Sequence, residues 1–287
     1  MMEENPGSLI GGERLSSRAL GVPPGVIGID AGMTLTKVAR ATADGIVLES
    51  RETNAGDGAA SVYGDDRPET RVGLTGARVS SLDDAGRAVR VQEIDAAARG
   101  TSALLKAEER LGNAEFVMAL LGTGTAFAAV RGTNVAHLGG TPLGGGSFAG
   151  IARRIDADLS YGAMIRQASR GDRRRVDAMI SDVYPEGIGR VGPDLTAAHL
   201  SKTGGAPEDV LAGLLNLHGE NIAQIAASRG IIAGIRRIVL AGGFVHGNPA
   251  LIGSITSMAA LFGVGVEVAP QPGFAGAIGA ALAAAAS

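Results

Sequence analysis

The chain of 287 residues has no cysteine, no tryptophan and only nine aromatic residues, six Phe and three Tyr. The missing cysteine excludes disulfides, thiolate metal sites, iron–sulfur clusters and cysteine nucleophiles. Few aromatic rings, a net charge of −3 and no basic stripe argue against a nucleic-acid partner. The alanine-rich end, from Ala277 to Ser287, is too short to span a bilayer, and the first 24 residues do not resemble a signal peptide. Composition thus predicts a soluble α/β protein with no membrane segment, which we expect in the cytoplasm.

Glycine is abundant, with 45 positions, and indicates many turns and close backbone packing. The length suits two modest domains or one duplicated fold. We expect residues 1–24 to form a flexible extension, 25–115 an N-terminal lobe and 116–287 a C-terminal lobe. The last helix, at about 276–287, should pack back on the N-terminal lobe.

Hydrophobic periodicity and turn signals give the expected elements. Strands are expected at 26–31, 35–41, 46–50 and 71–75, and a loop at 56–69. Helices are expected at 94–111, 148–169, 173–183 and 210–230.

The stretch 26–37 carries the first functional signal, since an apolar strand there runs into an acid, a glycine, hydroxyls and a lysine. A glycine lets the backbone approach a ligand, and hydroxyl and ammonium groups suit phosphate oxygens. The positions expected to bind phosphate are Gly32, Thr34, Thr36 and Lys37. Asp30 would hold Mg²⁺ through water, because magnesium keeps several waters and takes few carboxylates. An ordinary hairpin turn is the alternative.

Further glycine-rich turns follow apolar strands later in the chain. They are Gly122-Thr123-Gly124-Thr125 and Ala241-Gly242-Gly243. A third stretch, Gly144-Gly145-Gly146, opens a helical pattern, and helix N-termini bind phosphate through backbone N–H groups. The spacing is that of neither a P-loop nor a Rossmann motif. Several such turns predict a nucleotide held between two lobes.

In order along the chain, these motifs resemble type II pantothenate kinases. The resemblance runs from about Val26 to Ala284 and rests on the Asp-Ala-Gly-x-Thr-Leu-Thr-Lys hairpin and on segments 93–100, 122–125, 139–146, 193–198 and 273–280. It implies the actin-like ATPase fold, in which two duplicated mixed-sheet α/β lobes of ribonuclease-H-like type close over ATP. The absence of cysteine excludes relatives of that superfold that bind a cluster or zinc through cysteines.

The resemblance implies that Glu93, at the start of a helix, is the catalytic base, with Asp30 beside it in the catalytic site. A carboxylate near a bound alcohol accepts its proton late in phosphoryl transfer, when positioning matters more than basicity. The helix dipole should stabilise the anion. A carboxylate that merely caps the helix is the alternative.

Two residues depart from the family pattern where it binds pantothenate. Ala126 stands in place of a serine, and His137 in place of an arginine whose permanent charge suits a carboxylate. Losing one charge-assisted contact costs about 1.5–3 kcal/mol, roughly ten- to a hundred-fold in binding. Arg131, on the same expected hairpin, could replace that arginine. The candidate substrate positions are therefore Ala126, Arg131, His137, Gly140 and Thr141.

The sequence predicts an ATP- and Mg²⁺-dependent kinase that phosphorylates the primary alcohol of pantothenate, the first step of coenzyme A synthesis. Ala126 and His137 favour an alternative, a kinase of the same fold for another small alcohol. A nucleotide- or CoA-binding pseudokinase is a further alternative, against which the intact Glu93, Asp30 and Lys37 count. The resemblance also implies a homodimer, and it leaves open a CoA or acyl-CoA regulator.

Overall fold

The computed structural model describes residues 15–287 apart from 53–69, 82–87, 113–114 and 190. The loop expected at 56–69 and residues 1–14 of the expected extension lie outside the described residues. No helix in the described part of the chain is long and apolar enough to cross a membrane.

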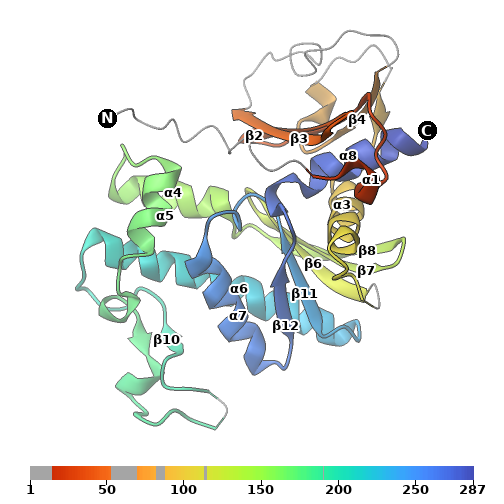
Figure 1. Ribbon diagram of the computed structural model, residues 1–287. Coiled ribbons are helices and arrows are strands. Elements are labelled where there is room, and N and C mark those ends of the chain that lie inside the picture. The colour runs from red at the N-terminus through yellow and green to blue at the C-terminus, as the bar shows by residue number, and fades with distance from the viewer. Residues whose placement is uncertain (1–14, 53–69, 82–87, 113–114, 190) are drawn as a thin grey trace.

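The first sheet has five strands in the order β3-β2-β1-β4-β5 (Figure 1). An antiparallel meander is formed by β1 (Val26–Ala31), β2 (Leu35–Thr42) and β3 (Gly45–Glu52). Two strands continue the sheet in parallel with β1, namely β4 (Arg71–Thr75) and β5 (Val89–Arg90). Every residue of the central strand β1 is buried, as its apolar sequence predicts.

The second sheet repeats this pattern in the order β12-β11-β6-β7-β8. Its antiparallel meander is β6 (Glu115–Leu121), β7 (Thr125–Arg131) and β8 (Asn134–Thr141). The parallel strands are β11 (Arg237–Ala241) and β12 (Gly265–Val268). The duplication therefore lies in the topology, with β1–β5 corresponding to β6–β8, β11 and β12.

Helices cover both faces of the second sheet. On one face, α6 (Pro207–Ile232) and α7 (Pro249–Leu261) pack on β6, β7 and β11 through a core that includes Phe127. On the other face, α3 (Glu93–Ala107) packs near Met118 and Ala128, and the Thr101 hydroxyl lies 3.7 Å from the Met118 sulfur.

The last helix, α8 (Ala275–Ala286), lies between α3 and strands β1 and β4 of the first sheet (Figure 1). Glycines allow α3, α8 and the first sheet to pack closely against one another. A Cβ built on Gly28 of β1 would lie 1.9 Å from the Ala277 carbonyl oxygen, and one on Gly279 would lie 1.7 Å from that of Ala96. Such distances leave room for hydrogen alone, so the glycines here are required by packing. Short 3₁₀ turns lie at Val79–Ser81 (η1) and Pro272–Phe274 (η4).

Part of the expected flexible extension is ordered, which corrects that expectation for residues 15–24. A short helix, α1 (Ser17–Leu20), begins at the capping residue Ser16. Leu20 and Val22 are buried, and Leu15 pairs with Ile46 of β3. Apolar side chains at these positions cover the edge of the first sheet, and that burial orders the segment.

The region between β8 and α6 departs most from expectation. The helix expected at 148–169 is two helices, α4 (Gly145–Ile155) and α5 (Tyr161–Ala168), with Ser160 capping the second. The helix expected at 173–183 was wrong. There the chain forms two 3₁₀ turns, Arg173–Arg175 (η2) and Ile180–Asp182 (η3), around strand β9 (Ala178–Met179), which pairs with β10 (Thr196–Ala198). The β9–β10 pair and the turns beside it extend away from the two five-stranded sheets, at the lower left of Figure 1.

Candidate active site

The structure brings the ends of both sheets together at the predicted glycine-rich turns. A Cβ built on Gly243 would lie 4.0 Å from the Lys37 ammonium, so the lysine of the first sheet reaches the turn that follows β11. That turn is anchored on β6, since the Phe244 N–H donates to the Leu121 carbonyl oxygen at 3.0 Å. Gly242 has φ +101, and a Cβ there would lie 2.2 Å from the same oxygen. Both the conformation and the space therefore require glycine at 242.

The turn at 122–125 packs directly on the start of α4. Gly145 N–H donates to the Gly122 carbonyl oxygen and Gly146 N–H to that of Thr123, at 2.8 and 2.9 Å. Gly144 N–H donates to the Ser147 hydroxyl, and the Thr125 hydroxyl donates to the Leu143 carbonyl oxygen. A Cβ on Gly144 would lie 2.7 Å from Gly124, so these glycines serve close packing between the turn and the helix.

These contacts bear on the phosphate-binding role expected for Gly144, Gly145 and Gly146. All three N–H groups donate within the chain, as do those of Gly32, Gly122 and Gly242. The three glycines shape the turn, and their contact with phosphate stays a prediction.

Asp30 and Lys37 lie opposite each other across the β1–β2 pair, with the carboxylate 3.7 Å from the ammonium. Asp30 is only 9% exposed. Two glycines that we had not assigned to the site crowd its carboxylate: a Cβ on Gly76 would lie 2.6 Å from one oxygen, and a Cβ on Gly276 would lie 2.7 Å from the other. The start of α8 therefore forms one wall of the Asp30 site.

Glu93 is the first residue of α3, and its side chain is open to solvent. Partial desolvation by the surrounding protein raises its pKa, the negative charge of Asp30 raises it further, and Lys37 lowers it. The three charges are thus electrostatically coupled. Desolvation and Asp30 together raise the pKa of Glu93, and Lys37 opposes them; the contribution of the helix dipole stays a prediction.

The other hairpin positions differ in where they lie. Thr34 is exposed at the hairpin tip, and Gly32 N–H donates to the Leu35 carbonyl oxygen at 3.2 Å, which closes the turn. Thr36 is 3% exposed. Alternation along β2 places it on the sheet face opposite Lys37, with Val38 rather than with the acids. The structure therefore does not bring Thr36 to the charged cluster.

The candidate substrate positions divide between the two faces of the second sheet. Ala126 pairs with Gly140, and His137 pairs with Ala128, a residue whose side chain packs on the α3 face. These positions share the face on which Glu93 begins its helix. Thr141 pairs with Thr125, next to the 122–125 turn, and its hydroxyl accepts the Leu143 N–H.

Arg131 lies elsewhere. It ends β7, six residues and roughly 20 Å from Thr125, and alternation places it on the face opposite Ala126. Its guanidinium donates to the Ala233 carbonyl oxygen and lies 3.5 Å from the Glu115 carboxylate. These contacts correct the idea that Arg131 replaces the arginine missing at 137.

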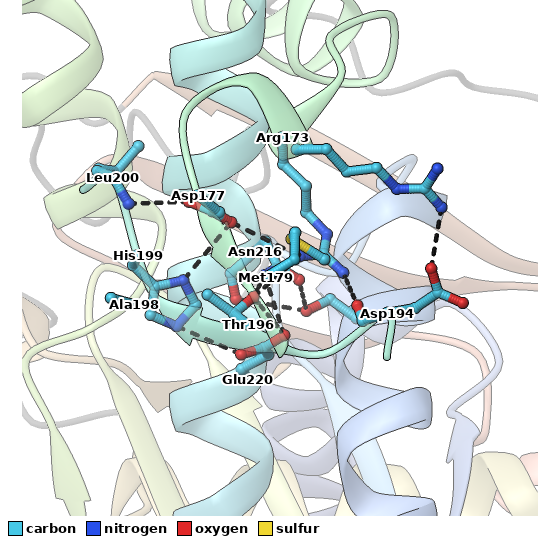
Figure 2. Close-up of polar contacts among 12 residues, drawn as sticks. Arg173, Asp177, Met179, Asp194, Thr196, Ala198, His199, Leu200, Asn216 and Glu220 are labelled. Atoms are coloured by element: carbon cyan, nitrogen blue, oxygen red, sulfur yellow. Dashed lines mark hydrogen bonds and ion pairs between the residues drawn. The ribbon is translucent and has the colours of Figure 1, made fainter. Parts of the chain in front are cut away.

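A second charged cluster, which the sequence had not indicated, joins residues 173–200 to α6 (Figure 2). The His199 ring lies between two buried acids, with Nε2 3.3 Å from Glu220 and Nδ1 3.8 Å from Asp177. Arg173 lies 3.7 Å from Asp177 and donates to the Thr196 hydroxyl, which donates to Glu220. Burial alone would lower the His199 pKa, but the two carboxylates outweigh it and raise the pKa to about 9.

A cavity of about 470 Å³ lies beside this cluster, lined in part by Arg173, Arg174, Asp194, Asn216 and Glu220. Its charged lining is already paired within the protein. Arg174 lies 3.1 Å from Asp194, and the Asn216 amide donates to Glu220 at 3.0 Å. We therefore assign the cluster a structural role.

Comparison with known proteins defines the class first. Over 91% of this chain and 94% of the other, the fold matches the activator of the 2-hydroxyisocaproyl-CoA dehydratase from Clostridium difficile with bound ADPNP, at TM-score 0.60 and 19% identity. The fold also matches a ROK family glucokinase from Streptomyces griseus in complex with glucose and AMPPNP, over 91% of this chain and 99% of the other, at TM-score 0.56 and 16% identity. The fold is therefore that of the actin-like ATPases and sugar kinases, as predicted.

The family follows from sequence. Residues 113–283 match the family model Fumble. The type II pantothenate kinase of Oceanobacillus iheyensis is 30% identical over 89% of this chain and 98% of its own length, and that of Staphylococcus haemolyticus is 27% identical over 88% and 98%. The chain belongs to the Fumble family of type II pantothenate kinases and is an ATP-dependent kinase.

Proposed function

We propose that this kinase transfers the γ-phosphoryl group of ATP to the primary alcohol of pantothenate, the first step of coenzyme A synthesis. The observation that carries the proposal is the meeting of Asp30, Lys37 and Glu93 beside the glycine-rich turns. An acid, a cation and a partly desolvated carboxylate are the groups that in-line phosphoryl transfer needs for its metal, its phosphate and its nucleophile. The names of the relatives support pantothenate as the acceptor.

Glu93 is the proposed base. Desolvation and the negative charge of Asp30 raise the pKa of Glu93, so its carboxylate accepts a proton more readily than that of an ordinary glutamate. Lys37 would bind the β- or γ-phosphate, since its ammonium reaches the turn at Gly243. Lobe closure over the nucleotide would bring the acceptor alcohol to Glu93.

Mg²⁺ is the proposed cofactor, and Asp30 would hold it. The described residues contain no group of three or more His, Asp or Glu side chains that could form a metal cage. The single carboxylate of Asp30 fits magnesium, which is usually bound by one or two carboxylates together with phosphate oxygens and waters. When bound, the ion would neutralise charge on the transferring phosphoryl group.

The remaining nucleotide contacts stay predictions. The candidate groups are Gly32, Thr34, Gly122, Thr123, Gly124, Thr125, Gly242 and Gly243. Thr123 is exposed at the turn between β6 and β7, which supports it as a candidate contact. We also propose a cytoplasmic homodimer of two-lobed subunits, divided near residue 115, whose activity a CoA species could regulate.

A different small alcohol is the second candidate acceptor. Ala126 and His137 stand where the family has a serine and an arginine, and the structure shows that Arg131 does not replace the arginine. A substrate without a carboxylate would lose less from these changes than pantothenate does.

The test is ATP turnover by purified protein with Mg²⁺, with and without pantothenate, followed by mass spectrometry of the product. Saturable phosphopantothenate formation, abolished in Glu93→Gln, would support the proposal. Turnover only with other alcohols would favour the second candidate. ATP binding without turnover of any alcohol would favour the third alternative, a nucleotide- or CoA-binding pseudokinase.

A further inference from the structure

Arg229 of α6 holds a β-bulge in β8 next to the candidate substrate residue His137. Its guanidinium donates to the Leu138 carbonyl oxygen and lies 5.4 Å above the Phe127 ring. Both contacts come from the sheet face opposite α3, since Phe127 belongs to the core under α6. Arg229 is the only Lys or Arg in α6, a helix of 26 residues.

The bulge is visible in the strand register. Ala128 pairs with His137, whereas the preceding residue, Phe127, pairs with Gly139, so that Leu138 is the extra residue of β8. Bulges locally bend a strand and change which side chains share a face. The Leu138 bulge places His137 and Gly140 on the same face of the sheet, although they are three positions apart in β8. His137 pairs with Ala128 and Gly140 with Ala126 of β7.

Two independent features show that the bulge and the arginine fit each other. Gly139 has φ +90, a conformation that side chains rarely adopt. A Cβ on Gly139 would also lie 2.5 Å from the Arg229 Nη1. The guanidinium thus occupies the space that any other residue at 139 would need, and the cation–π contact with Phe127 fixes its orientation.

Without the bulge, the register would slip by one residue. Gly139 would then face Ala126, Gly140 would face Thr125, and Thr141 would leave its place beside the 122–125 turn. Gly140 would then no longer share the face of His137, on which Glu93 begins α3. The bulge is therefore the feature that aligns the outer half of β8 with the site.

We propose that Arg229 is a positioning residue for the acceptor alcohol: by holding the Leu138 bulge it sets the register of Gly140 and Thr141 relative to His137. The inference rests on the proposed function, because it assigns these positions to the acceptor. The proposed nucleotide contacts at Lys37 and Gly243 lie on other strands, and only the 122–125 turn adjoins Thr141, so the effect of Arg229 should be larger on acceptor binding than on ATP binding.

The test compares Arg229→Met and Arg229→Lys with the matched control Arg236→Met. Arg236 is exposed, and its guanidinium also donates to a carbonyl oxygen, that of Phe262 at 3.1 Å, but away from the site. We expect Arg229→Met to raise the KM for pantothenate roughly tenfold or more, with a clearly smaller change in the KM for ATP. Lysine, which retains a donor, should restore part of the affinity. The control should match wild type.

A second readout keeps the inference independent of the proposed function. Amide hydrogen exchange of the intact protein, measured on the 134–141 peptide, should be faster in Arg229→Met and unchanged in Arg236→Met. Faster exchange with an unchanged pantothenate KM would overturn the positioning role. Unchanged exchange would overturn the role in the bulge. If wild type does not phosphorylate pantothenate, the proposed function fails, and the exchange measurement with the KM for the alcohol that is turned over decides the inference.

Discussion

His199→Gln should remove a partly buried positive charge and destabilise the protein in a pH-dependent way. The variant leaves Asp177 and Glu220, whose side chains are 0% and 7% exposed, with Arg173 as the remaining cation of the cluster in Figure 2. Glutamine is similar in size and uncharged. The change therefore tests the charge of the ring more than its volume.

The magnitude follows from linkage. The His199 pKa rises from 6.5 to about 9, and at about 1.4 kcal/mol per pH unit this difference allows at most about 3 kcal/mol. The ring is 20% exposed, and solvent screening lowers the figure to about 2 kcal/mol. For a chain of this length, that lowers Tm by about 3–6 °C.

The pH dependence has a definite sign. Because the folded pKa lies above the unfolded one, the contribution of His199 is complete below pH 6.5 and is lost as pH rises through about 9. The Tm difference between wild type and variant should be largest near pH 6 and close to zero above the folded pKa. Scanning calorimetry across this range measures it, and the NMR titration of the His199 ring reports the pKa directly.

The matched control is Arg174→Gln, which removes an exposed ion pair with Asp194, where the side chains are 64% and 79% exposed. It should change Tm little at any pH. A His199→Gln difference that stays constant from pH 6 to above the folded pKa would refute the reasoning, because the ring would then act by packing alone.

Three further changes test the site and the fold. Glu93→Gln should abolish phosphoryl transfer while ATP affinity, measured by calorimetry, is retained; in wild type, kcat should fall on acidification at a higher pH than for an ordinary glutamate, because the folded pKa is raised. The pair Ala126→Ser and His137→Arg should lower the KM for pantothenate by roughly ten- to a hundred-fold, and an unchanged KM would dissociate these positions from the acceptor. Gly279→Ala, whose Cβ would lie 1.7 Å from the Ala96 carbonyl oxygen, should destabilise by about 1–3 kcal/mol in urea unfolding, whereas Gly253→Ala, with open space around it, should not.

The sequence predicted those parts of the fold in which one short pattern decides the outcome. Val26–Ala31 and Arg71–Thr75 are apolar enough to be central strands, and both have the predicted bounds. The glycine-rich turns were identified because each follows an apolar run or opens a helical pattern, and their order along the chain then carried the family resemblance. Their roles were less well predicted, since Gly144–Gly146 serve packing between two backbones, a long-range property that spacing does not reveal.

The misses share a physical cause. Residues 173–183 have a composition compatible with a helix, but Arg173 and Asp177 bond to Thr196 and His199 across the chain. Tertiary contacts of this kind override local propensity. Arg229 likewise lies in a run that reads only as buried helix, and its partner Leu138 is 91 residues away. No local signal marks either pairing.

Helices α3 and α8 explain how the charged residues Asp30, Lys37 and Glu93 are held between the two sheets. Glu93 begins α3, which packs on the second sheet, whereas Asp30 ends a strand of the first sheet and contacts Gly276 at the start of α8. Each half of the duplicated fold thus lends its final helix to the other half. Because α3 and α8 contact at Gly100 and Gly279 with no side chain between their backbones, the separation of the two carboxylates is set by that helix pair. Closure of the lobes would therefore move the proposed nucleotide turns while the spacing of the proposed base and the proposed metal ligand stays nearly constant.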